Sequence, residues 1–158
     1  MSNDKQSSLD NINKALLHIT TESPSVVIGG SISFIARGLL DREPKDIDLF
    51  FTEYVSLSKV GLLSCNIDEI GSDTVTDING KEIQRTSMVI MGVKVCAFKV
   101  DADTLKHDII EFNGITIKAQ MPEYGIIAKK IYAEKNDKHK KDLEIILPRL
   151  SMGNNRKL

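Results

Sequence analysis

The stretch VVIGGSISFIARGLLDREPKDIDLFF, residues 26–51, decides how this chain folds. Its first residues, Val26–Ile28, predict a buried strand, and the glycines that follow end this strand in a tight turn. Apolar residues then recur at helical spacing: Ile32, Ile35, Ala36, Leu39 and Leu40. The first half of the stretch therefore predicts a strand, a glycine turn and a helix.

The turn consists of Gly29, Gly30 and Ser31. Glycine allows the backbone to approach a ligand closely, and the free N–H groups at the start of a helix suit a phosphate. We therefore expect these three residues to bind a nucleotide through its triphosphate.

The second half of the stretch ends in DIDLFF, which predicts another strand. Because side chains alternate along a strand, Asp46 and Asp48 share one face, with apolar residues on the other. Two such carboxylates can hold Mg²⁺ or Mn²⁺, since Mg²⁺ takes one or two carboxylates together with substrate phosphates. An isolated pair of this kind is more often the solvated face of an edge strand, but the nearby glycine turn favours a metal site.

The combination of Gly29-Gly30-Ser31 with Asp46-x-Asp48 resembles the signature of the polymerase-β-like nucleotidyltransferase superfamily. The resemblance implies an α/β nucleotidyltransferase fold, a mixed β-sheet flanked by helices with C-terminal helices beside the cleft. It also implies catalytic and metal-binding roles for Asp46 and Asp48. A class of tRNA nucleotidyltransferases shares part of this pattern, but this chain has Ser33-Phe34 where Arg-Asp is expected there.

The C-terminal region is most similar to the AbiEii-type nucleotidyltransferases, which include toxins of toxin–antitoxin and phage-defence systems. The matching segments are Gly114-Ile115, Pro122-Glu123, Ile127-Ala128-x-Lys130-Ile131-x-Ala133 and Lys141-Asp142-Leu143. In that family the helix lysine and the later aspartate belong to the active site. The resemblance therefore implies catalytic roles for Lys130 and Asp142, and nucleotide binding by Lys130. Lys129 is the alternative register for the lysine.

The superfamily usually carries a third acid on a strand that faces the two aspartates. The segments Glu82–Met91 and Val93–Val100 predict a β-hairpin around Gly92, and aligning the second strand with the family puts Cys96 at that position. Asp101 lies an odd number of residues further on, which places it on the opposite face of an unbroken strand. We expect Cys96 to be a core thiol and not a nucleophile.

Patterning elsewhere predicts further elements. These are a helix capped by Ser7-x-x-Asp10 with Leu9, Ile12, Leu16 and Ile19 on its apolar face, a weak helix Glu53–Leu63, strands Asn66–Ile70 and Thr74–Ile78, a turn at Asn79-Gly80, a hairpin of Ile109–Phe112 and Gly114–Lys118, a helix that begins at Pro122, and a helix Asp142–Leu150.

Composition fits a single nucleotidyltransferase-like domain over residues 1–158: an N-terminal helix and turn (1–24), a sheet core (25–120), C-terminal helices (121–150) and a tail (151–158). A net charge of −1 argues against a wholly basic nucleic-acid binder. Cys65 and Cys96 indicate neither a disulfide framework nor a zinc site, and no signal peptide or membrane-spanning run is present. We therefore expect a cytoplasmic protein without membrane contact.

The sequence thus predicts a metal-dependent nucleotidyltransferase that moves a nucleoside monophosphate from an NTP to an acceptor hydroxyl. The expected acceptor is RNA, tRNA or a protein, and the resemblance adds a toxin–antitoxin or phage-defence setting with a cognate partner protein. The alternative is a catalytically silent relative that binds a nucleotide, an RNA or a partner. Cys96 favours this alternative, whereas the acidic pair and the Lys130/Asp142 pair count against it.

Overall fold

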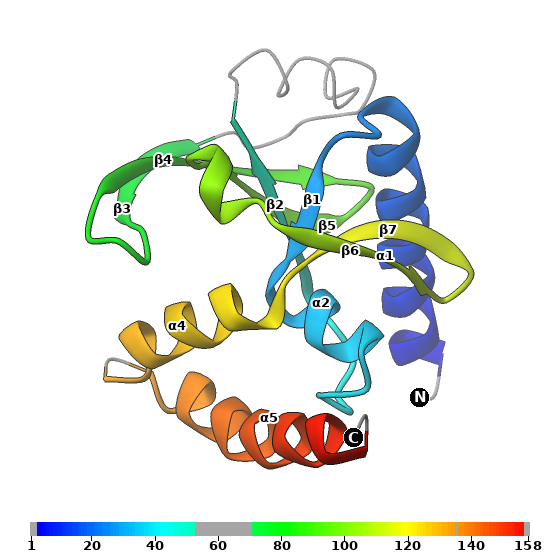
Figure 1. Cartoon of the computed structure of the whole chain (residues 1–158). Coiled ribbons are helices and arrows are strands. Elements are labelled where there is room, and N and C mark those ends of the chain that lie inside the picture. The colour runs from blue at the N-terminus through cyan, green and yellow to red at the C-terminus, as the bar shows by residue number, and fades with distance from the viewer. Residues whose placement is uncertain (1–2, 53–70, 135, 157–158) are drawn as a thin grey trace.

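The computed structural model describes residues 3–52, 71–134 and 136–156, and its centre is a seven-stranded sheet of mixed direction (Figure 1). The strand order is β3-β4-β5-β2-β1-β7-β6. Helices lie on both sides of this sheet, which confirms the predicted α/β class. The predicted elements Glu53–Leu63 and Asn66–Ile70, together with Cys65, lie outside the described residues.

The strands are β1 (Val27–Gly29), β2 (Asp46–Phe51), β3 (Gly71–Thr76), β4 (Glu82–Ile90), β5 (Val93–Lys99), β6 (His107–Phe112) and β7 (Ile115–Gln120). The helices are α1 (Asn3–Glu22), α2 (Gly30–Ala36), α4 (Pro122–Ala133) and α5 (Asp137–Arg156), with a short 3₁₀ helix, η2 (Ala102–Thr104), before β6.

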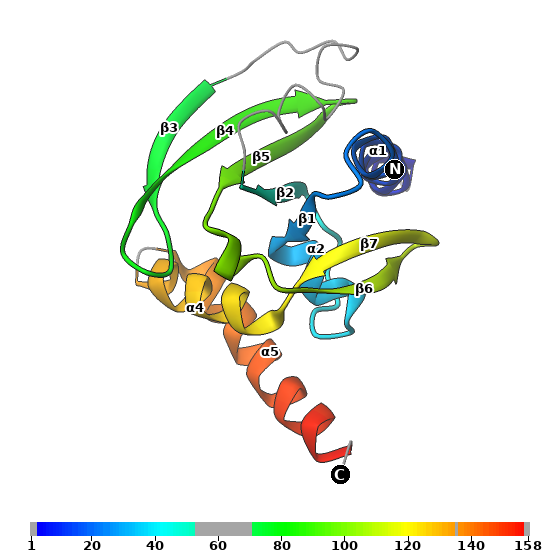
Figure 2. The same cartoon turned by 45° about the horizontal axis from the view of Figure 1, so that its top comes forward.

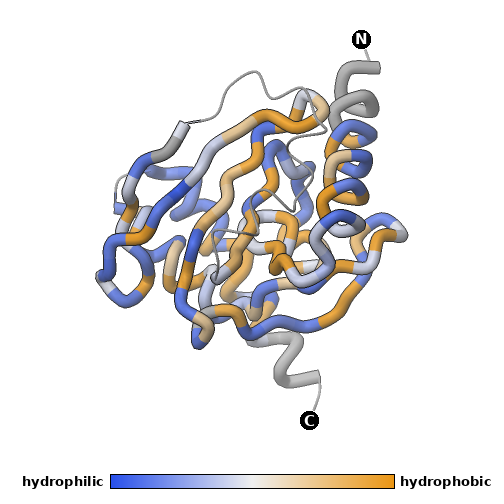
Figure 3. Tube along the Cα trace, turned by 90° about the horizontal axis from the view of Figure 1, so that it is seen from above, coloured by the Kyte–Doolittle hydropathy of each residue, from blue (hydrophilic) through white to orange (hydrophobic). Residues whose placement is uncertain are grey.

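The central strand β2 has one buried face and one face that is only partly covered. Ile47, Leu49 and Phe51 are buried, and they alternate with partly exposed residues along the strand. The buried face packs into a core that includes Ile12 and Leu16 of α1. Figure 2 shows α1 end-on beside the central strands, and Figure 3 shows hydrophobic segments of the strands meeting in the middle of the molecule. The face that carries Asp46 and Asp48 is therefore left for α4 and the cavity.

The first helix begins earlier than the capping box predicts. α1 starts at Asn3, so Ser7 lies within the helix. The prediction of a helix start at Ser7 is wrong because the backbone before it is already helical, and a capping residue needs a non-helical backbone. The predicted apolar face is confirmed, since Ile12, Leu16 and Ile19 are buried in the core.

Two of the predicted hairpins end in the loops that their sequences favour. Met91 and Gly92 join β4 to β5 with φ values of 52° and 78°. Asn113 and Gly114 join β6 to β7 with φ values of 50° and 82°. Two-residue loops with positive φ at both positions match the twist of antiparallel strands, so both hairpins are confirmed.

The C-terminal helices form a separate layer over α2 (Figure 1). Pro122 stands at the start of α4, as predicted. The last helix is longer than predicted, because α5 begins at Asp137 and not at Asp142. Asn136 precedes it, and its Oδ1 atom accepts a hydrogen bond of 2.9 Å from the N–H of Lys138. A second apolar cluster holds this layer together: Phe34, Leu39, Leu40, Ile126 and Ile146.

None of the helices among the described residues is both long and apolar enough to cross a membrane.

Two adjacent leucines of α1 test the packing of this helix against the sheet. Leu16 is fully buried, whereas the side chain of Leu17 is 55% exposed. We expect Leu16→Ala to lower the free energy of unfolding by about 2–5 kcal/mol, because it removes core contacts and leaves a cavity. Leu17→Ala should change it by less than about 0.5 kcal/mol. Urea denaturation of both variants checks this, and equal losses would mean that α1 is not docked as described.

Candidate active site

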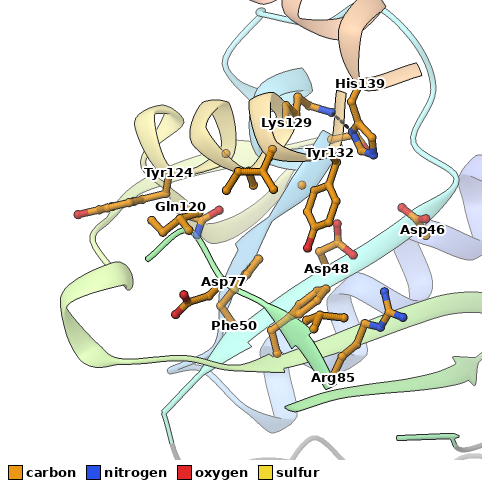
Figure 4. Close-up of a pocket in the computed structure, with 18 of the residues that line it drawn as sticks. Asp46, Asp48, Phe50, Asp77, Arg85, Gln120, Tyr124, Lys129, Tyr132 and His139 are labelled. Atoms are coloured by element: carbon orange, nitrogen blue, oxygen red, sulfur yellow. Dashed lines mark hydrogen bonds between the residues drawn. The ribbon is translucent and has the colours of Figure 1, made fainter. Parts of the chain in front are cut away.

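A cavity of about 490 Å³ lies between the partly covered face of the sheet and α4 (Figure 4). Its lining includes Gly30, Ser31, Asp46, Asp48 and Lys129. These residues come from the start of α2, from β2 and from α4, which are far apart in the sequence. The fold therefore brings both halves of the residue 26–51 stretch and the C-terminal helices to one site.

The glycine turn fits tightly against the second aspartate. β1 and β2 run antiparallel with Gly29 opposite Asp48. Gly30 has a φ of 61°, and a Cβ atom at this position would lie 2.1 Å from Oδ2 of Asp48. Only glycine fits here, because both the backbone conformation and the missing side chain are needed. The turn and the acidic strand thus form a single unit.

Gly29 differs from its neighbours because it is not part of the cavity lining described for this site. A Cβ atom there would lie 2.3 Å from the Phe50 ring and 2.8 Å from Oε1 of Gln120. Gly29 therefore makes room for these two side chains, both of which do line the cavity. Its structural contribution is close packing beneath the site.

The electrostatic centre of the cavity is Asp48. Burial of its carboxylate raises its pKa to about 7, and the charge of Asp46 adds to this shift, while Lys129 and Lys94 oppose it. Lys94 lies directly beside Asp46 in the register of β5 and β2. Two carboxylates so close together destabilise one another unless a cation lies between them. The site is therefore arranged to gain from a bound cation.

Of the two candidate lysines, Lys129 lines the cavity. Lys130 is exposed to solvent and is not part of the cavity lining. The ammonium of Lys129 donates a hydrogen bond of 2.8 Å to Oδ2 of Asp142, and its Nζ lies 3.5 Å from Nδ1 of His139 (Figure 4). It also lies 5.8 Å from the centroid of the Phe34 ring. Of the two registers that the resemblance left open, the cavity lining therefore includes Lys129 and not Lys130.

Asp142 is buried beside Lys129 and is not part of the described cavity lining. Arg42 donates to it as well, with Nη2 2.9 Å from Oδ2. Burial raises the pKa of Asp142, but the hydrogen bonds from Arg42 and Lys129 outweigh this effect and hold the pKa below its usual value. Asp142 therefore remains a carboxylate that fixes the ammonium of Lys129 in place.

His139 lines the same wall of the cavity as Lys129. Burial lowers its pKa, and the charge of Lys129 lowers it further. The imidazole is therefore neutral near pH 7, and its Nδ1 can accept a hydrogen bond from the Lys129 ammonium. Its ring also packs at a tilt against Tyr132, with centroids 5.7 Å apart.

Cys96, the residue for which the resemblance implied a third acid, lies beside Asp48. The two residues are register partners on parallel strands. Burial raises the pKa of the thiol, and the charge of Asp48 raises it further. A thiol with a raised pKa carries little thiolate at neutral pH and is a poor nucleophile. Asp101 lies elsewhere, where its Oδ1 accepts a 3.0 Å hydrogen bond from Lys81.

Sequence reasoning missed several residues of the site. Lys94 precedes Cys96 by two positions, so strand periodicity could have placed it on the acidic face. No local signal marks Arg42, which reaches Asp142 across 100 positions of the chain. Asp77 and Gln120 also line the cavity, and both are buried polar residues at strand ends.

The donor set fits one kind of metal site. Within the parts of the chain that the structure describes, no cluster of three or more histidine, cysteine or acidic side chains is arranged to hold a metal ion. Asp46 and Asp48 alone do not make a complete protein cage. Two carboxylates suffice for Mg²⁺ when substrate phosphates supply further oxygen ligands, so the residues fit a cation that is bound together with a nucleotide.

Comparison with known proteins adds no family assignment: no protein-family model matches the chain, and the curated proteins contain no significant match.

The raised pKa of Asp48 gives a stability prediction. Its pKa is about 7 when folded, against a value of 3.8 for a free carboxyl. The folded state therefore holds the proton more tightly, and the free energy of unfolding falls as pH rises from about 4 to 7. Asp48→Asn should remove this loss and stabilise the metal-free protein by about 2–4 kcal/mol at pH 8, but not at pH 4.

Urea denaturation across this pH range measures the effect, with Asp10→Asn on the exposed face of α1 as the matched control. If Asp48→Asn stabilises the protein equally at pH 4 and pH 8, the pKa of Asp48 is not raised in the folded state.

Proposed function

We propose that this protein is a metal-dependent nucleotidyltransferase, which transfers a nucleoside monophosphate from an NTP to an acceptor hydroxyl and releases pyrophosphate. The observation that carries the proposal is the convergence of Asp46, Asp48 and Lys129 on one cavity, against the Gly30–Ser31 turn. Acidic residues for a cation, a lysine for phosphate charge and a close backbone turn are the groups that phosphoryl transfer needs.

Asp46 and Asp48 would hold Mg²⁺ or Mn²⁺ together with the phosphates of the NTP. The cation would neutralise phosphate charge and polarise the phosphoryl oxygen that is attacked. Burial is the main cause of the raised pKa of Asp48, and the charge of Asp46 adds to it. A bound cation would offset both effects, because it favours the charged form of each carboxylate.

Lys129 would contact phosphate oxygens, in the role that the resemblance implied for Lys130. An ammonium is a compact charge that suits a phosphate, and the buried contact with Asp142 fixes its position. Asp142 is then a positioning residue and acts through Lys129. Gly30 and Ser31, which line the cavity beside Asp48, would lie against the triphosphate.

The acceptor is a hydroxyl of RNA, of tRNA or of a protein. The resemblance to AbiEii-type proteins motivates a toxin–antitoxin or phage-defence setting and a cognate partner protein. The use of an NTP and the unpaired Cys96 thiol fit a cytoplasmic location.

A second candidate function is nucleotide binding without catalysis. It is favoured by Cys96, because a thiol beside Asp48 supplies no third carboxylate for the cation. The two functions share the same cavity and differ in whether the bound phosphate is transferred.

Incubation with each radiolabelled NTP, Mg²⁺ and total cell RNA or lysate protein tests the proposal. We expect label to move onto RNA or protein with the wild type but not with Asp48→Asn. If the protein binds an NTP but no label appears on RNA or on lysate protein, the silent alternative is favoured.

The two adjacent lysines provide a matched pair for binding. Lys129→Met should weaken binding of an NTP with Mg²⁺ by about tenfold or more, since it removes a buried charged contact to phosphate. Lys130→Met should change the affinity by less than about twofold, because an exposed charge is well screened. Isothermal titration calorimetry measures both, and melting temperatures check that Lys129→Met folds. Equal effects of the two substitutions would refute the role of Lys129.

Substitution of Cys96 separates the two candidate functions. Cys96→Ser should keep most of any transferase activity, because the thiol is not a nucleophile. Cys96→Asp should raise activity and tighten Mg²⁺ binding by adding a carboxylate beside Asp48. Loss of activity in a folded Cys96→Ser protein would show that the thiol takes part in the reaction.

A further inference from the structure

Gln120 has a side-chain amide that the fold itself does not use. It is the last residue of β7 and is only 7% exposed. Its backbone carbonyl accepts a hydrogen bond of 3.1 Å from Nη2 of Arg37, which fixes the end of the strand. The side-chain amide has no hydrogen-bond partner among the described residues, and neither of its polar atoms is sealed off from solvent. Buried amides usually have such partners, so this amide is available to a ligand.

The pairing of β7 with β1 directs this amide into the cavity. The two strands run parallel with Ile28 opposite Ala119, and both of these side chains belong to the core. Because side chains alternate along a strand, Gln120 projects from the other face of the sheet, which borders the cavity. Gln120 is part of the cavity lining, and Figure 4 shows its amide reaching into the pocket on the side where Asp48 lies.

The two glycines of the turn bring this amide near the carboxylate of Asp48. A Cβ atom on Gly29 would lie 2.8 Å from Oε1 of Gln120, and one on Gly30 would lie 2.1 Å from Oδ2 of Asp48. The amide and the carboxylate therefore lie over consecutive residues of the turn. In the sheet, β1 separates β2 from β7, and two strand spacings amount to about 10 Å. This separation leaves room for one group of a ligand between the two side chains.

The ribose is the part of an NTP that this amide would meet. Under the proposed function, the phosphates and the cation lie at Asp46 and Asp48. The ribose is bonded to the α-phosphate, whereas the base is attached only beyond the ribose. A group beside Asp48 therefore lies closer to the sugar than to the base. Each ribose hydroxyl both donates and accepts hydrogen bonds, and so does an amide.

The freedom of the amide also favours a hydroxyl over a base as its partner. Base edges differ in their fixed patterns of donors and acceptors. The described residues provide no group that holds the Gln120 amide in one orientation, so its oxygen and nitrogen can exchange places. Such an amide selects weakly among base edges, but it pairs with a hydroxyl in either orientation.

We infer that Gln120 is a specificity-determining residue of this cavity, and that its amide forms a hydrogen bond with a ribose hydroxyl, so that the site prefers ribonucleotides to deoxyribonucleotides. This inference rests on the proposed function, since it assigns the sugar position of the NTP site. A nucleotide that lacks the hydroxyl would cover the amide without pairing with it. A polar group that a ligand buries and leaves unpaired weakens the binding of that ligand.

The substitution Gln120→Met tests this inference, because methionine keeps the length of the side chain and adapts to irregular space but has no amide. Gln84→Met is the matched control. It makes the same change in the same sheet, on β4, at a residue that is not part of the cavity lining. Melting temperatures check that both variants fold.

The experiment is a calorimetric titration with ATP, GTP, CTP and UTP, with the 2′-deoxy and 3′-deoxy forms of the nucleotide that binds most tightly, and with inorganic triphosphate, each with Mg²⁺. We expect the wild type to bind the ribonucleotide about fivefold or more tightly than at least one of its deoxy forms. Gln120→Met should reduce this ratio to about twofold or less by weakening ribonucleotide binding, with affinity for inorganic triphosphate unchanged. Gln84→Met should keep the wild-type ratio.

The outcomes separate this inference from the proposed function. If the wild type binds both deoxy forms as tightly as the ribonucleotide, the role of Gln120 is overturned, whether or not Gln120→Met folds. It is also overturned if a folded Gln120→Met protein keeps the wild-type ratio, or if this protein loses as much affinity for inorganic triphosphate as for the ribonucleotide. In each of these cases the nucleotidyltransferase proposal stands. If neither the NTPs nor inorganic triphosphate bind, both are overturned.

Discussion

The close approach of Gly30 to the carboxylate of Asp48 is the constraint on which the rest of the site depends. The antiparallel pairing of β1 and β2 sets Gly29 opposite Asp48, and the positive φ of Gly30 turns the chain over that carboxylate into α2. A side chain at Gly30 would collide with Asp48. Both residues also line the cavity, so this contact sets the shape of the cavity wall.

Burial of that carboxylate creates an electrostatic cost that the surrounding layers only partly offset. Lys129 contributes a positive charge from α4, and Asp142, which also pairs with Arg42, holds it there. Lys94 contributes another from β5. Even so, the pKa of Asp48 is raised to about 7, so repulsion and desolvation remain. Sites that keep such unfavourable charge arrangements are often functional, because a ligand recovers the lost stability.

The lining of the cavity combines charged with apolar side chains, as the proposed nucleotide ligand would require. The charged side chains include Asp46, Asp48 and Lys129, and the apolar ones include Phe50 and Phe98, whose rings stack on each other. Cys96 lies beside Asp48 and supplies no third carboxylate there. Under the proposed function, transfer of a phosphoryl group would therefore depend on how well two carboxylates and the substrate complete the cation site.

The sequence by itself determined the features that depend on local periodicity and turn chemistry. The strand Asp46–Phe51 has the predicted bounds, and both two-residue hairpin loops lie where Gly92 and Asn113-Gly114 indicate. Only the tertiary structure decided which lysine enters the cavity, because Lys129 and Lys130 differ by about 100° around α4 and neither is favoured by local pattern. The same holds for Asp77 and Arg42, since burial and long-range pairing arise only when the sheet and helices pack together.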